Sequence, residues 1–249
     1  MSGFHCRIVG FQASESRFPI FRNAGFRRPG HWCHEARNTH NSQFMEQFGN
    51  PITNDRGWDY VLLPELAEFV LGSTPKSSEP EYWDGDVKWI TPAELEDTSF
   101  VIYDSVRHIT EAGVKAAGLK PFPAGTVIFS TRAPIGKTAI AGCDMYCNQG
   151  FKNLICGPRL NPVYLFSVLR MHKEYFISLG TGATFKELSK ARLEKIAISV
   201  PPMELQKKFE EFYRQSDKSK VAVLSCSNLN LWSSSDQPKK CLLRNGPLL

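Results

Sequence analysis

The sequence is poor in the features that define secreted, metal-binding and membrane-spanning proteins. Its seven cysteines are an odd number, and Cys143 and Cys147 have three residues between them instead of the two of a zinc ribbon. No run approaches the roughly 18 apolar residues of a membrane helix, and arginines stand near the N-terminus where a signal peptide would have its apolar segment. We therefore expect a cytoplasmic protein with reduced thiols and no membrane contact.

The arrangements of residues that carry out catalysis are also missing. His108 and His172 lie in unrelated contexts, and no serine occupies a Gly-x-Ser-x-Gly turn. Asp86-x-Lys88 could belong to a metal-dependent nuclease, which needs carboxylates for Mg²⁺ and a lysine beside the attacking water. A solvated strand edge explains these two charges more simply. We expect no catalytic residue, no metal and no cofactor.

One tetrapeptide, Asn161-Pro162-Val163-Tyr164, is superficially similar to the base-binding site of amino-methyltransferases. Its third residue departs from that site, and it opens a helix instead of ending a strand. No glycine-rich turn after a strand is available to seat S-adenosylmethionine. Asn161 is therefore better explained as a helix N-cap.

The composition favours a mixed fold with many turns. The 249 residues include 16 prolines and 18 glycines, and the hydrophobic content of 42% suits a globular protein. A net charge of +5 is compatible with a polyanionic partner but is too small to demonstrate one. The predicted fold class is α+β.

Short β-rich runs alternate with helical patterns through the middle of the chain. Pro64 precedes one short helix, and the longest helix has apolar residues at every third or fourth position. Together they predict one domain of short mixed strands and helices over residues 58–202. The predicted strands are 58–63, 87–90, 126–129, 138–141, 151–155 and 196–200, and the predicted helices are 65–70, 109–117 and 161–179. Thr110 is the predicted N-cap of the second helix, and Thr91 that of a single helical turn after residue 90.

The two ends of the chain do not share this alternation. Residues 1–41 contain six arginines, no lysine and two acidic residues before position 41, and we expect a poorly ordered arm. Residues 42–57 combine a short helix with a turn. A helix is predicted over 203–232, and the Ser- and Pro-rich residues 233–249 are expected to form an unstructured tail.

An apolar stripe lies on the otherwise charged helix that follows Pro202. It consists of Leu205, Phe209 and Phe212, and such a stripe needs a partner helix. We predict that the stripe is a subunit interface that pairs two copies of the chain in a homodimer. In the rival arrangement it folds back on residues 44–48 of the same chain.

Polar and basic residues on the predicted loops have the chemistry of a DNA reader. Arginine suits guanine edges or phosphates, amides suit adenine, and hydroxyls and lysines suit phosphates. The same residue types populate any surface turn, so they do not decide the function alone. We expect Arg132, Asn148 and Gln149 to face DNA. The full set of candidates is Ser73, Thr74, Lys76, Thr131, Arg132, Lys137, Asn148, Gln149, Thr181, Thr184 and Lys186.

Several short motifs occur in one order along some two thirds of the chain, from about Trp58 to Lys220. They are Gly72-Ser73-Thr74-Pro75, Glu81-Tyr82-Trp83-x-Gly85-x-x-x-Trp89-Ile90-Thr91-Pro92, Ile109-Thr110-x-x-Gly113, Pro123-x-Gly125-Thr126-Val127, Arg132-Ala133-Pro134-Ile135-Gly136, Asn148-Gln149-Gly150-Phe151 and Pro201-Pro202-x-x-x-Gln206. In this order they resemble a target recognition domain of the specificity subunits of type I restriction–modification systems.

The resemblance implies a non-enzymatic subunit that recognises double-stranded DNA. Such a subunit holds two methyltransferase subunits and, through them, the restriction subunits. Each recognition domain reads one half of a split site, and long helices pair antiparallel to set the spacing between the halves. By this resemblance the helix over 203–232 is the spacer, and residues 42–57 are the end of a spacer that precedes a second recognition domain.

The chain departs from the family pattern in size. Members of the family usually carry two recognition domains, and this chain has room for one, so it resembles a half-subunit or a fragment. The alternative is a protein-interaction module that does not bind DNA, or an inactive fragment, on the same scaffold.

Overall fold

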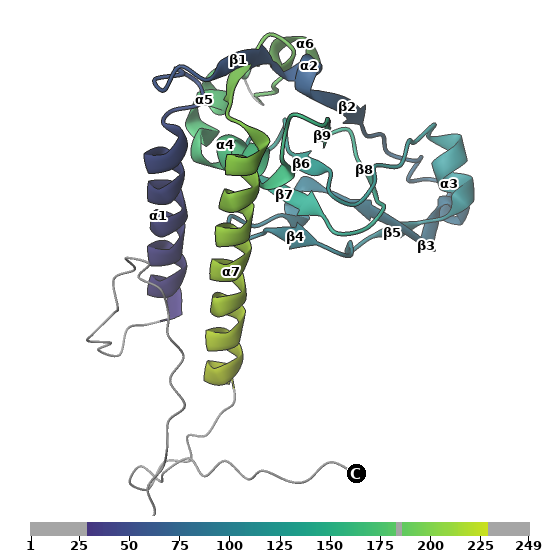
Figure 1. The fold of residues 1–249 in the computed structure, drawn as a ribbon. Coiled ribbons are helices and arrows are strands. Elements are labelled where there is room, and N and C mark those ends of the chain that lie inside the picture. The colour runs from purple at the N-terminus through teal and green to yellow at the C-terminus, as the bar shows by residue number, and fades with distance from the viewer. Residues whose placement is uncertain (1–28, 183–185, 229–249) are drawn as a thin grey trace, which may run out of the picture.

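The computed structural model describes residues 29–182 and 186–228. Two long helices, α1 (Pro29–Phe48) and α7 (Met203–Asn228), lie antiparallel beside one another and extend beyond a body of short strands and helices (Figure 1). This mixture of helices and sheets confirms the predicted α+β class.

The body contains three sheets within the described residues. The central sheet has five strands in the order β2-β9-β6-β7-β4, and only its edge strand β4 pairs in parallel. The other two sheets have the orders β5-β3-β8 and β1-β10. The strands are β1 (Asp59–Leu62), β2 (Ala67–Leu71), β3 (Trp83–Ile90), β4 (Val101–Ile102), β5 (His108–Ile109), β6 (Val127–Phe129), β7 (Thr138–Ala141), β8 (Tyr146–Cys147), β9 (Lys152–Cys156) and β10 (Ala197–Val200).

Short helices connect and cover these strands. They are α2 (Leu63–Leu66), α3 (Glu111–Ala116), α4 (Pro162–Met171), α5 (Lys173–Ser178) and α6 (Lys190–Leu193), with the 3₁₀ turns η1 (Pro80–Tyr82) and η2 (Pro92–Glu94). Three predicted N-caps are confirmed. Thr110 and Asn161 accept backbone N–H bonds at the starts of α3 and α4, and Thr91 forms a capping box with Glu94.

The middle strands β6 and β7 of the central sheet are buried on both faces. In β6, Val127 and Phe129 point into the large core beneath the helices, whereas Ile128 points into a second apolar cluster with Phe122 and Phe151. Successive side chains of a strand alternate between faces, so a continuous apolar run is what two covered faces require. The sheet therefore gives the loops at its edges a rigid support.

Aromatic side chains from three helices meet in the large core. Phe44 and Phe48 of α1 lie 5.3 and 5.6 Å, between ring centroids, from Phe209 of α7. Tyr164 of α4 stacks on Phe44 at 5.2 Å, and its hydroxyl donates a hydrogen bond to the Ser199 carbonyl (2.8 Å). The pairing of α1 with α7 is therefore part of the folded core of one chain.

This packing corrects the assignment of Phe209 to a subunit interface. The side chain is 1% exposed, so a second copy of the chain cannot reach it. Leu205 and Phe212 are half-buried and pack against the same core. The stripe thus folds back on residues 44–48, which is the rival of the predicted dimer interface.

Gln206 joins the start of α7 to the start of α4. Its side-chain oxygen accepts a hydrogen bond from the Asn161 N–H (2.8 Å), and its amide donates to the carbonyls of Pro201 (2.7 Å) and Arg159 (3.1 Å). Asn161 in turn donates from its side chain to Glu210 (2.6 Å). Because Gln206 is fully buried, its three hydrogen bonds replace the bonds that its amide would otherwise make with water.

Three boundaries differ from the prediction. The short helix predicted at 65–70 is α2, but it ends at Leu66, because residues 67–71 form β2 and pair with β9. The helix predicted at 161–179 is interrupted at His172, which separates α4 from α5. Helix α1 begins at Pro29, inside the segment predicted as a poorly ordered arm. No apolar residue recurs at helical spacing between Ala36 and Phe44, so the sequence pattern gave no sign of this extension. Residues 1–28, 229–232 and the predicted tail 233–249 lie outside the described residues.

Candidate nucleic-acid interface

Loops that are distant in the sequence converge at one region of the body. The Ser73 N–H donates to the Cys147 carbonyl (3.1 Å), and the Thr74 hydroxyl donates to the Gln149 side-chain oxygen. Gly72 lies so close to the neighbouring backbone that a Cβ there would be 2.1 Å from the Asn148 carbonyl oxygen. The loops at 72–76 and 147–149 therefore form a single unit.

The loop at 130–137 joins this unit through Gly150. The Gly150 carbonyl accepts the N–H of Thr131 (2.8 Å), and the Thr131 carbonyl accepts the N–H of Leu188 (2.9 Å). Arg132 and Thr181 both form β-bridges with Glu187. The structure thus brings together the loops that carry the predicted DNA-binding residues.

A lysine, a glutamate and an arginine form a charged row at this junction. The Lys152 ammonium, only 7% exposed, lies 3.1 Å from Glu187 Oε1 and donates to the Thr131 hydroxyl (2.9 Å). Arg132 Nη1 lies 3.7 Å from Glu187 Oε2, and both of these side chains are partly exposed. Two cations and one carboxylate leave a net charge of +1. Lys152 therefore compensates Glu187 from inside the protein, and Arg132 keeps its charge toward the solvent.

This geometry shows that the prediction of Thr131 as a DNA-binding residue is wrong. Its side chain is fully buried, and its hydroxyl is occupied by Lys152 and the Gly150 carbonyl (3.3 Å). The Thr131 hydroxyl therefore stabilises the loop from inside the protein and cannot reach DNA. The physical reason is that the buried Lys152 needs an oxygen partner in addition to Glu187.

Lys137 and Asn148 also have structural partners. The Lys137 ammonium donates to the Pro92 carbonyl (3.0 Å). Asn148 accepts the Gly150 N–H with its side-chain oxygen (2.9 Å), which closes a turn. Both side chains are half-buried, so their polar groups brace the loops in the free protein.

The remaining predicted residues differ in exposure. Thr74, Lys76, Gln149, Thr181 and Lys186 are exposed, Ser73 is half-buried, and Thr184 lies outside the described residues. Lys152 and Glu187 were not among the predicted site residues. Lys152 stands at the end of a strand and Glu187 follows a turn, and charged residues at such positions are usually solvated. No local pattern shows that the two side chains pair across 35 residues.

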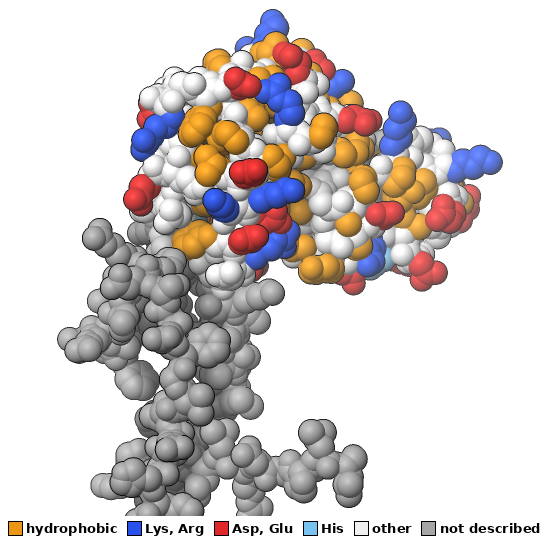
Figure 2. Space-filling view, viewed as in Figure 1, with side chains coloured by type: hydrophobic (Ala, Val, Ile, Leu, Met, Phe, Trp, Pro, Cys, Tyr) orange, Lys and Arg blue, Asp and Glu red, His pale blue; other side chains and the backbone are white. Residues whose placement is uncertain are grey.

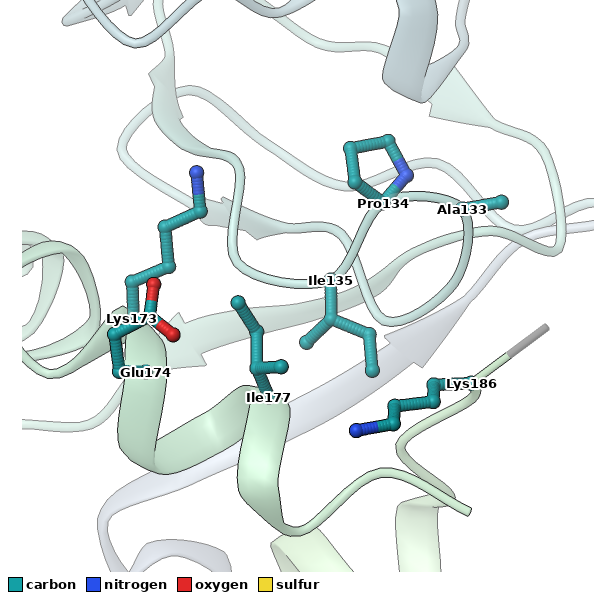
Figure 3. A pocket seen from close by; sticks show the side chains of 7 residues that line it. All are labelled: Ala133, Pro134, Ile135, Lys173, Glu174, Ile177 and Lys186. Atoms are coloured by element: carbon teal, nitrogen blue, oxygen red, sulfur yellow. The ribbon is translucent and has the colours of Figure 1, made fainter. Parts of the chain in front are cut away.

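A pocket of about 430 Å³ lies beside the turn that follows Arg132. Figure 3 shows Ile135 of the turn and Ile177 of α5 side by side, with Lys186 on one side and Lys173 and Glu174 on the other. The pocket therefore places Lys186 close to the loop that carries Arg132.

Charges of both signs are mixed on the molecular surface. On the face shown in Figure 2, Lys and Arg alternate with Asp, Glu and apolar side chains instead of forming one basic field. Attraction to a polyanion would then depend on a few placed cations rather than on a continuous patch.

The described residues offer no group of three or more His, Cys, Asp or Glu side chains that could hold a metal ion. Burial raises the pKa of Cys147 and of Cys156 to about 12, so neither thiol supplies a thiolate at neutral pH. In the same part of the chain, no helix combines the length and the apolar character needed to cross a membrane.

Residues 55–225 match the family described as the type I restriction modification DNA specificity domain. Because this match covers more than half of the chain, the chain belongs to that family, as the motifs predicted.

Relatives of the chain carry corresponding names. It is 37% identical over 170 residues to the type I restriction enzyme MjaIX specificity subunit of Methanocaldococcus jannaschii. The aligned region covers 67% of this chain and 39% of that protein. It is 24% identical over 153 residues to the HindI specificity subunit of Haemophilus influenzae, with coverage of 60% and 33%. The chain thus spans less than half the length of these relatives.

Solved structures show the same fold. The crystal structure of the HsdS subunit from Thermoanaerobacter tengcongensis superposes with a TM-score of 0.58 and 20% identity, over 81% of this chain and 48% of that one. The type I restriction–modification S subunit from M. genitalium gives a TM-score of 0.52 and 12% identity, over 80% and 54%.

Proposed function

We propose that this chain recognises double-stranded DNA as the specificity component of a type I restriction–modification system, and that it has no catalytic activity of its own. The observation that supports this most directly is the convergence of the loops at 72–76, 130–137 and 148–150 in a chain of the specificity family. The chain would read one half of a two-part site.

The exposed side chains of the converged loops suit different parts of DNA. Gln149 and Arg132 have the donors and acceptors to bind base edges, adenine for the amide and guanine for the guanidinium. Lys76, Lys186 and the hydroxyls of Thr74 and Thr181 suit phosphates, as does the half-buried Ser73, whereas Thr184 lies outside the described residues. Asn148 and Lys137 would contribute by holding the loops in place, since the Asn148 side-chain oxygen and the Lys137 ammonium are already bonded.

The division of the chain into segments belongs to this proposal. Residues 58–202 would be the recognition domain, and α7 would be the spacer that lies beside α1. The methyltransferase subunits would bind the helical part, and the restriction subunits would join through them. A homodimer would have to use surfaces other than Phe209, which is inside the core. Such a complex acts on DNA in the cytoplasm.

Co-expression with the neighbouring methyltransferase subunit, followed by mapping of methylated genomic sites, tests the proposal. We expect the two proteins to co-purify and methylation to occur at one defined sequence. Arg132→Ala should lose roughly 1–3 kcal/mol of discrimination at one position of the site. Methylation that is the same with and without this chain would contradict the proposal and favour an interaction module that does not bind DNA.

A further inference from the structure

The segment 103–107 forms a rigid projecting loop next to the converged loops. Its tip residue Val106 is 82% exposed. The Val106 N–H donates to Glu94 Oε2 (2.6 Å), and the buried Ser105 hydroxyl accepts from the Trp89 N–H (2.9 Å) and donates to the Arg107 carbonyl (2.8 Å). The loop is therefore fixed before any ligand arrives, so little ordering entropy would be lost on binding.

Arg107 leaves this loop and lies on two tryptophans. Its guanidinium carbon is 4.0 Å from the centroid of the Trp83 ring and 5.6 Å from that of Trp89. The two indoles are themselves in edge-to-face contact at 5.3 Å. Stacking leaves the N–H groups at the rim of the guanidinium free to bind an anion or a base edge.

The same two tryptophans hold the loop at 73–76. Trp89 Nε1 donates to the Ser73 carbonyl (3.0 Å), and Trp83 Nε1 donates to the Lys76 carbonyl (3.2 Å). Arg107 is thus placed beside the loop that carries Thr74 and Lys76, through a platform that both segments share.

Arg107 has no ion-pair partner among the residues that the structure describes. The acidic residue of the projecting loop, Asp104, is engaged with His108 (3.1 Å) and with the Ser105 N–H (2.9 Å). Across the described ranges 29–182 and 186–228, no carboxylate forms an ion pair with the exposed Arg107. This sheet, β5-β3-β8, lies on the side of the body away from α1 and α7 (Figure 1).

We propose that Arg107, preorganised on Trp83 and Trp89, is a second DNA-contacting arginine that extends the interface beyond Arg132 and Gln149. This inference rests on the proposed function. The planar guanidinium could bind a backbone phosphate or the edge of a guanine, and both require the same fork of donors.

The test measures binding of the full chain to random-sequence duplex DNA at several salt concentrations, with sequencing of the bound duplexes. We expect Arg107→Ala to lower the affinity about tenfold. If Arg107 neutralises a phosphate, the slope of log affinity against log salt becomes shallower by about 0.9, and Arg107→Lys restores it. If it binds guanine, the preference at one position is lost, and Arg107→Lys restores it incompletely.

The control is Arg159→Ala, which removes an exposed arginine that pairs with Asp59 in the part of the body near β1. It should leave the affinity, the salt slope and the preference at the wild-type values. If the wild-type chain binds DNA and Arg107→Ala matches it in all three measurements, the inference is overturned. If the wild-type chain shows no salt-dependent binding at all, the proposed function fails and this inference fails with it.

Discussion

Lys152 Nζ lies 3.1 Å from Glu187 Oε1, whereas Nη1 of the partly exposed Arg132 lies 3.7 Å from the other oxygen of the same carboxylate. The buried lysine is therefore the nearer of these two cations. A carboxylate that faced Arg132 alone would cancel its charge toward DNA. With Lys152 beneath it, Glu187 can orient the guanidinium while the row as a whole remains positive.

Replacing Lys152 with Met should weaken both stability and DNA binding. The Thr131 hydroxyl and Glu187 lose their donor, which costs about 1–3 kcal/mol in the free energy of unfolding. The net charge of the row falls from +1 to zero, so the salt slope for DNA binding should become shallower by about 0.9. Urea unfolding and salt titrations measure the two effects.

The double variant Lys152→Met with Glu187→Gln separates charge from packing. It returns the row to a net charge of +1 through Arg132 alone, so the salt slope should recover although the stability does not recover fully. A slope that stays shallow in the double variant would show that Lys152 acts on DNA binding through the loop structure and not through charge.

Replacing Gly72 with Ala should separate the two loops that form the Thr74–Gln149 contact. The new Cβ would lie 2.1 Å from the Asn148 carbonyl oxygen, so one backbone must move. We expect a lower affinity for DNA together with a moderate loss of stability. Gly118→Asn is the matched control, because Gly118 has a φ of +60° with nothing within 4 Å of an added Cβ, and asparagine tolerates that conformation. Equal effects of the two substitutions would contradict this assignment.

Features with a local cause could be predicted from the sequence. Thr91, Thr110 and Asn161 were identified as N-caps because a cap depends on residues two or three positions away. Three strands of the central sheet, β6, β7 and β9, were found from short apolar runs for the same reason, whereas β2 was predicted as a helix and β4 was not predicted. The fold class and the family therefore followed from the order of such local signals.

The roles of individual polar residues could not be predicted in this way. Thr131 and Lys152 are polar, yet both are buried, because Glu187 and Gly150 approach them from distant parts of the chain. Arg107 was also missed, since its position depends on the stacking of Trp83. Tertiary contacts decide which polar side chains brace a loop and which remain available to a ligand.

His172 should make the protein less stable in mild acid. Burial lowers its pKa below the usual value of 6.5, and its Nε2 is buried without a hydrogen-bond partner. The unfolded chain then binds the proton more readily, so this contribution to stability is present above about pH 6.5 and is lost as the pH falls below it. Urea unfolding at pH 7, 6 and 5 should show a smaller loss for His172→Gln than for the wild type. The control is His108→Gln, which retains His172 and should therefore keep the loss of stability that His172 causes in the wild type. Identical pH profiles for His172→Gln and the wild type would contradict the assignment.

Phe209→Ala should destabilise the single chain rather than dissociate a dimer. The side chain is 1% exposed and contacts Phe44 and Phe48, so truncation leaves a cavity between α1 and α7. We expect the free energy of unfolding to fall by about 3–5 kcal/mol, measured by urea denaturation followed by circular dichroism. Lys208→Ala, at the exposed neighbouring position, should change it by less than about 0.5 kcal/mol. Sedimentation of the folded fraction should give the same mass for both variants and the wild type, because the aromatic stripe joins helices of one chain. A wild-type dimer that Phe209→Ala converts to a monomer of unchanged stability would restore the intermolecular arrangement.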